Sequence, residues 1–186
     1  MVARVQSKEL LLAQLVDVFE SRGFTGATLN HLAAATGLRK ASLYHHFPGG
    51  KAEMAAVLLR DTVARLEQGA FAKLNTKQPP NERLQRFVEG FSTYVEAGEG
   101  HCFIAVLAQG HILAEDQALI TQQYKDWLQR LAEVFEQTGQ KPKRAARSAA
   151  ALLAELYGHL LVAKLRANSK HFRRGVKRLK KELGRC

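Results

Sequence analysis

The sequence has little cysteine, little proline and no long apolar run. Two cysteines among 186 residues exclude a scaffold held by several disulfide bonds, and a reducing cytoplasm is the simpler expectation. Four prolines leave room for long helices. No run of about 18 apolar residues occurs, so we expect no membrane span. Residues 1–9 also lack the apolar core of a signal peptide.

The motifs of common catalytic and metal sites are missing as well. The Gly-Gly-Lys sequence at 49–51 lacks the upstream glycine and the following serine or threonine of a phosphate-binding loop, and there is no His-Glu-x-x-His motif. His45 and His46 are adjacent and point to different helix faces, so they do not converge on a metal. His101 and Cys102 are also adjacent, which is a poor geometry for a catalytic pair. We therefore expect no enzymatic activity, no metal site and no cofactor.

Positive charge is abundant and unevenly distributed. The net charge is +11, and a hydrophobic content of 46% is that of a globular protein with a substantial core. Residues 1–51 carry +3, residues 52–140 carry −4 and residues 141–186 carry +12. Basic ends around an acidic middle indicate that part of the molecule binds nucleic acid and the rest is a regulatory body. A basic tail that is merely solvated is the alternative that charge leaves open.

Apolar residues at helical spacing predict two helices near the N-terminus. The first covers about residues 8–22 and is followed by Gly23, a typical residue just past a helix C-terminus. The second covers about residues 28–35, with Thr28 as a plausible N-cap. The apolar stripe of the first helix consists of Leu11, Leu15, Val18 and Phe19.

A third helix, over about residues 38–47, follows a tight turn at Gly37. Leu43 and Phe47 are expected to face inward, and Pro48 ends the helix because it pushes the preceding residue out of the helical region. Two short helices around a glycine turn form a helix-turn-helix, whose second helix can enter the major groove of DNA. A helical hairpin with a solvated polar face is the alternative that spacing leaves open.

The third helix carries side chains suited to DNA. The side chains at 39–42 can hydrogen-bond base edges or allow a close approach to them, whereas Tyr44 and His45 suit phosphate oxygens. Lys51 lies at the start of the following helix, where backbone amides and the helix dipole also favour an anion. The candidates on the helix are Arg39, Lys40, Ala41, Ser42, Tyr44 and His45.

The run from Phe24 to Lys51 closely resembles the DNA-binding domain of the TetR/AcrR family of bacterial repressors. The resemblance spans about residues 7–60, and its strongest part is Ser-Leu-Tyr-His-His-Phe at 42–47 followed by Lys51. It implies that Thr28 and the residues after it anchor phosphate, that the face of 39–45 lies in the groove, and that Lys51 clamps the backbone. Arg39 stands where the family usually has serine or threonine, and Ala41 where glycine is frequent, which bears on the operator sequence.

The resemblance also implies the architecture and the function. It implies an all-α homodimer with a three-helix DNA-binding domain at residues 1–50 and a larger helical domain for effector binding and dimerisation at 51–186. The expected function is that of a cytoplasmic, ligand-responsive repressor that binds a palindromic operator and is released by a small-molecule effector. Coupling would pass through the helix that joins the two domains, predicted over about 51–74.

Apolar residues at helical spacing predict further helices in the larger domain, over about 81–97, 102–108, 115–138, 143–166 and 169–183. An effector pocket is expected among them, although an aromatic stripe at helical spacing is more often plain core. The candidate effector contacts are Phe91, Tyr94, His101, Cys102, His111, Tyr124, Trp127, Tyr157 and His159.

Two features of the body leave alternatives open. Cys102 begins an apolar helix, where a thiol becomes more reactive, so a redox- or electrophile-sensing repressor is the alternative function; a buried packing thiol is the other interpretation. The segment 169–183 is an amphipathic basic helix that either attracts DNA or a membrane surface or packs beside the dimer helix. The expected interface is the 143–166 helix, through Ala149, Ala150, Ala154, Gly158 and Leu161.

Overall fold

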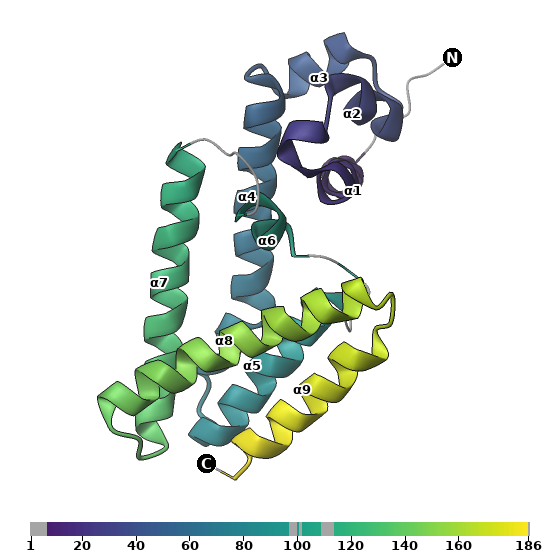
Figure 1. The fold of residues 1–186 in the computed structure, drawn as a ribbon. Helices are drawn as coiled ribbons and strands as arrows, with labels where there is room; N and C mark the ends of the chain where they lie inside the picture. Colours follow the sequence, from purple (N-terminus) through teal and green to yellow (C-terminus); the bar gives the residue numbers. More distant parts are fainter. Residues whose placement is uncertain (1–6, 97–99, 101, 109–113, 186) are drawn as a thin grey trace. The chain divides into compact units, whose positions relative to one another are not determined.

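The computed structural model describes residues 7–96, 100, 102–108 and 114–185, and all regular secondary structure in these ranges is helical (Figure 1). The all-α prediction is therefore confirmed. The helices are α1 (Lys8–Gly26), α2 (Leu29–Thr36), α3 (Lys40–His46), α4 (Gly50–Gly69), the 3-10 helix η1 (Phe71–Asn75), α5 (Pro80–Tyr94), α6 (Phe103–Ala108), α7 (Ala114–Gln137), α8 (Pro142–Leu165) and α9 (Lys170–Leu183).

The chain forms two compact units. The first is drawn from residues 1–62 and 102–120, and the second from residues 63–101 and 121–186. Helix α4 begins in the first unit and ends in the second, and α7 does the same. The first compact unit extends beyond residue 50, to residue 62, and includes 102–120, so the functional boundary expected between residues 50 and 51 stays a prediction.

Local chemistry sets the helix ends of the first unit. The Ser7 hydroxyl accepts a hydrogen bond from the Leu10 amide at 3.3 Å and caps α1. Gly23 lies inside the assigned range of α1 with φ of 65° and ψ of 171°, so the regular helix ends there, as its sequence position predicts. Gly37 adopts the left-handed conformation after α2, with φ of 68°.

Phe19 lies at the centre of the first unit. Its ring stacks on Phe24, with 6.1 Å between centroids, and meets the edge of Phe103 in α6 at 5.9 Å. Leu32 and Leu43, from α2 and α3, are completely buried. Fully burying a leucine or phenylalanine contributes about 1.5–3 kcal/mol, so this core holds the helix pair rigidly.

The second unit is built around Phe71 and helix α9. The Phe71 ring stacks on Trp127 at 4.7 Å and meets the edge of Phe87 at 4.8 Å. Helix α9 packs against α8 and α5, as Figure 1 shows, and buries Phe172, Leu179 and Leu183, so the packed final helix predicted from its stripe is confirmed.

The helix predicted over about 51–74 is confirmed as far as Gly69 and is wrong for its last five residues. Helix α4 ends at Gly69, Ala70 has φ of −109° and ψ of −59°, and the chain continues as η1. The break turns Phe71 and Leu74 into the core, where both are at most 1% exposed, so tertiary packing overrides a continuous helical pattern.

Helix α8 is long and apolar enough to cross a membrane by length and composition alone. Its apolar side chains include seven that are buried within the second unit, among them Leu153 and Leu156. A core helix of a soluble protein passes the same test, so we do not interpret α8 as a membrane span.

Candidate functional site

Most of the predicted DNA-binding side chains at α2 and α3 are accessible to solvent. Thr28, Arg39, Lys40, Ala41 and His45 are exposed, and Ser42 is half-buried. Leu43 points the other way into the core, because it lies on the opposite side of a seven-residue helix. These side chains are therefore accessible to a ligand, and their contact with DNA stays a prediction.

Thr28 and Arg39 differ as caps. The Thr28 hydroxyl accepts the His31 amide at 3.3 Å, and the His31 ring nitrogen accepts the Thr28 amide at 3.3 Å, which completes a capping box. Arg39 occupies the N-cap position of α3 and makes no side-chain capping bond. Its guanidinium is exposed, consistent with the departure from serine or threonine noted in the sequence.

Tyr44 combines exposure with support from α4. Its side chain is 46% exposed, and its ring edge lies 3.3 Å from the position that a Cβ on Gly50 would occupy. Gly50 has φ of +65°, which a residue with a side chain rarely adopts. The glycine at the start of α4 thus makes room for the Tyr44 ring.

Lys51 has a contact that its sequence position does not reveal. Its ammonium donates to the Phe24 carbonyl oxygen at 2.8 Å and lies 4.5 Å from the centre of the Phe24 ring. Lys51 therefore ties α4 to the segment before α2. A phosphate clamp at Lys51 stays a prediction, and the two remaining ammonium protons could serve it.

The predicted effector residues do not form one cluster. Cys102 belongs to the first unit and is 2% exposed, whereas the other described candidates belong to the second. Phe91 is buried and meets the Tyr157 ring at 5.3 Å, and Tyr124 is exposed. His101 and His111 lie outside the described residues.

Trp127 is buried and belongs to a partly buried hydrogen-bond network around Glu67. One carboxylate oxygen of Glu67 accepts the Trp127 indole N–H at 2.7 Å and the Gln123 amide at 3.1 Å. Arg130 forms an ion pair with the same carboxylate at 2.7 Å and lies 5.2 Å from the Phe71 ring centre. The indole donor is thus already satisfied inside the core.

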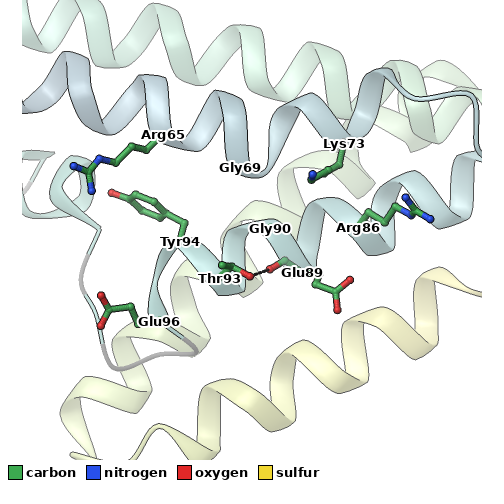
Figure 2. A pocket seen from close by; sticks show the side chains of 9 residues that line it. All are labelled: Arg65, Gly69, Lys73, Arg86, Glu89, Gly90, Thr93, Tyr94 and Glu96. Atoms are coloured by element: carbon green, nitrogen blue, oxygen red, sulfur yellow. Dashed lines mark hydrogen bonds between the residues drawn. The ribbon is translucent and has the colours of Figure 1, made fainter. Parts of the chain in front are cut away.

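A groove of about 760 Å³ opens where the end of α4, η1 and α5 meet. Tyr94 is the one predicted effector residue among its lining residues. Figure 2 shows Gly69 and Gly90 facing each other at the crossing, with Arg65 and Tyr94 on one side of them along the groove and Lys73 and Arg86 on the other. The sequence signal that could have located it is a glycine within each of two helical patterns. The lining residues are Arg65, Gly69, Lys73, Arg86, Glu89, Gly90, Thr93, Tyr94 and Glu96.

His159 lies in a polar cluster between α8 and α9. Its Nδ1 is 3.1 Å from His171 Nε2, and its Nε2 is 3.2 Å from an Arg178 nitrogen that also donates to Glu155 at 2.7 Å. Burial lowers the pKa of His159, and the charges of His171 and Arg178 lower that pKa further, against an opposing effect of Glu155.

The lowered pKa predicts acid sensitivity. The unfolded chain binds a proton at His159 more readily than the folded chain, so the stability that neutral His159 contributes is complete above its ordinary pKa of 6.5 and is lost as pH falls through the lower folded value. Thermal unfolding followed between about pH 7.5 and about pH 5.5 should show a smaller acid destabilisation in His159→Gln than in wild type. The exposed control His45→Gln should behave like wild type; equal acid sensitivity in His159→Gln would contradict the prediction.

The comparisons with known proteins agree with the helix-turn-helix. Residues 11–58 match the family model described as bacterial regulatory proteins, tetR family. The chain is 27% identical to the HTH-type transcriptional regulator LmrA of Bacillus subtilis, over 88% of this chain and 89% of LmrA.

Two solved structures are similar in fold. A TetR transcriptional regulator from Legionella pneumophila is 17% identical, with a TM-score of 0.80 over 98% of this chain and 99% of that chain. The regulator AibR, solved in complex with isovaleryl coenzyme A and operator DNA, is 21% identical, with a TM-score of 0.66 over 81% of this chain and 85% of that chain.

Proposed function

Because the chain belongs to the TetR family of bacterial transcriptional regulators, we propose that it is a cytoplasmic repressor that binds a palindromic operator as a homodimer and is released by a small-molecule effector. The observation that carries the proposal is the set of exposed polar side chains at α2 and α3, two helices that the buried Leu32 and Leu43 hold in place. A short helix held rigidly with its base-reading side chains exposed has the geometry for major-groove binding.

A homodimer is supported by an exposed apolar stripe on α8. Leu161 and Leu165 are 54% and 77% exposed, which is unusual for two leucines one turn apart. Ala151, Ala154 and Gly158 continue the stripe at spacings of three and four, so another helix can approach closely along it.

The exposed stripe does not include all of the interface residues expected from the sequence. Ala154, Gly158 and Leu161 remain in the proposed interface, whereas Ala149 is completely buried and Ala150 is half-buried. Ala149 faces the unit's own core because it lies on the opposite side of the helix, whereas Ala150 lies one turn before Ala154, at the edge of the stripe. A dimer also supplies the second recognition helix, because one short helix reads too few bases for a specific operator.

The proposed mechanism has two states. Without effector the two DNA-binding domains, residues 1–50, match the spacing of the operator half-sites; effector bound to the body, residues 51–186, favours an arrangement that does not. Helix α4 is the proposed coupling element because it begins beside the recognition helix and ends at the groove. The structure solved for AibR, with isovaleryl coenzyme A and operator DNA, shows that a protein of similar fold binds both kinds of ligand.

The structure supports some of the proposed effector contacts better than others. Tyr94 lines the groove, whereas Phe91, Tyr124, Trp127 and Tyr157 do not. The alternative function, sensing of oxidants or electrophiles by Cys102, requires a thiol that a reagent can reach. Burial of Cys102 favours release by a reversible ligand instead.

The proposed function is tested by selecting random duplex DNA with the purified protein at near-physiological salt and sequencing the bound pool. We expect an enriched palindrome, since a symmetric dimer reads two identical half-sites. The absence of any enriched sequence would overturn operator recognition and would leave charge-driven, nonspecific binding as the explanation of the basic composition.

The selected operator then tests the recognition helix. Tyr44→Ala is expected to weaken operator binding about tenfold, because it removes a contact at the DNA face while the dimer stays intact. Tyr124→Ala, which truncates an exposed tyrosine of the second unit, is the matched control and should bind like wild type. Unchanged affinity of Tyr44→Ala, measured by titration of labelled operator, would remove Tyr44 from the interface.

A further inference from the structure

The groove of the second unit points to the chemical class of the effector. We propose that it binds a small anion carrying phosphate or carboxylate groups between Lys73 and Arg86, an inference that rests on the proposed effector-released function. A volume of about 760 Å³ lies within the usual range of small-molecule sites. Five of its nine lining residues are charged, and the stems of these side chains add apolar surface, so the groove suits a ligand that has a charged group on a partly apolar body.

Two cations flank one end of the groove from different elements. Lys73 comes from η1 and Arg86 from α5, and both are exposed. Within the described part of the chain, neither cation has a carboxylate within ion-pair distance. Figure 2 shows the Arg86 guanidinium pointing away from Lys73, but the side chain is exposed and can turn, so that an anion at this end accepts hydrogen bonds from both cations.

The carboxylates of the groove do not compete for this position. Glu89 is paired with Lys180 of α9 at 3.1 Å. Glu96 lies at the other end, on the Tyr94 side (Figure 2). The anion is therefore expected at the Lys73 and Arg86 end.

Backbone forms the floor of the groove because both crossing positions are glycine. At Gly90 an added Cβ would lie 2.2 Å from the Gly69 carbonyl oxygen, so Gly90 is required for the helices to cross. At Gly69 an added Cβ meets no atom within 4 Å. A side chain at 69 can therefore occupy the groove without disturbing the packing.

The position of the groove suits a regulatory ligand. An anion held by Lys73 and Arg86 connects η1 to α5, and η1 follows directly on the end of α4. A ligand that holds this junction in one arrangement biases the end of α4, the proposed coupling element. Differential binding to two arrangements of the junction is the source of free energy for operator release.

The experiment measures anion binding by the full chain without DNA. Inorganic pyrophosphate and citrate are titrated calorimetrically at physiological salt into wild type, into Lys73→Gln/Arg86→Gln and into Lys177→Gln/Lys181→Gln. The second double variant removes two exposed lysines of α9 and has the same net charge, so it corrects for the general attraction of anions to a basic protein. Gly69→Leu fills the groove without a change of charge.

We expect saturable binding by wild type and the α9 variant, and binding at least about tenfold weaker in Lys73→Gln/Arg86→Gln and Gly69→Leu. Binding of pyrophosphate alone assigns a phosphate ligand, and binding of citrate alone assigns a carboxylate. Equal binding by the two double variants, full binding by Gly69→Leu, or no saturable binding of either probe would overturn the inference. A failed operator selection would overturn the proposed function separately, because the titration contains no DNA.

Discussion

Replacing Gly90 with alanine is expected to lower the free energy of unfolding by about 3 kcal/mol, which corresponds to a fall in Tm of about 10 °C for a chain of this size. In an ordinary helix the same change stabilises by roughly 1 kcal/mol, because alanine is the better helix former. Here the new methyl would lie 2.2 Å from the Gly69 carbonyl oxygen and 2.8 Å from the Ala70 Cα. Backbone cannot move aside as a flexible side chain can, so the steric cost exceeds the propensity gain.

Gly69→Ala is the matched control for this prediction. It adds the same methyl on the opposite side of the same crossing, where no atom lies within 4 Å, and should leave stability unchanged or slightly higher. Urea and thermal unfolding followed by circular dichroism measure both variants. If Gly90→Ala were as stable as Gly69→Ala, the backbones of α4 and α5 would not approach each other as closely as the structure shows.

The second large effect concerns assembly. Leu161→Glu combined with Leu165→Glu is expected to convert the proposed dimer to monomers and to reduce operator affinity about 100-fold, the scale on which linking two sites raises overall binding. The physical reason is that dimer formation would bury two unpaired carboxylates, which costs several kcal/mol each. Both leucines are exposed within the protomer, so its own fold should be retained.

The control for assembly adds the same charge elsewhere. Leu10→Glu with Leu119→Glu changes two other exposed leucines, one on α1 and one on α7, and should leave the dimer intact. Sedimentation velocity gives the mass of each species. A wild type that sediments as a monomer, or a Leu161/Leu165 variant that remains a dimer, would show that the α8 stripe is not the interface.

The helix-turn-helix was predictable because its determinants are local. Thr28 caps α2 through a residue three positions away, Gly37 ends the same helix through its own φ, and Leu43 faces inward through helical spacing. Each of these depends on neighbours within one or two turns. The polar residues of this region carried both the resemblance and the proposed function.

In the body, residues 51–186, the helices could be predicted from the sequence, but the residues that line the groove could not. The break of α4 at Gly69 depends on Phe71 and Leu74 reaching a core formed with Trp127, more than fifty residues away. The Lys51 contact with Phe24 spans 27 residues, and the cluster at His159 joins two helices. The spacing of residues within a single helix does not predict these contacts between helices.

The sequence by itself determined the helical class, the helix ends near the N-terminus, the polar residues of the helix-turn-helix and the amphipathic final helix, because these follow from backbone preferences and from the spacing of apolar residues. Tertiary structure alone decided which candidates lie at a surface. It buried Cys102 and Trp127 and placed Lys73 and Arg86 at the same end of a groove. Burial and long-range contacts arise only when helices pack together. They depend on interactions between side chains that are far apart in the sequence, so the spacing of residues within one helix does not predict them.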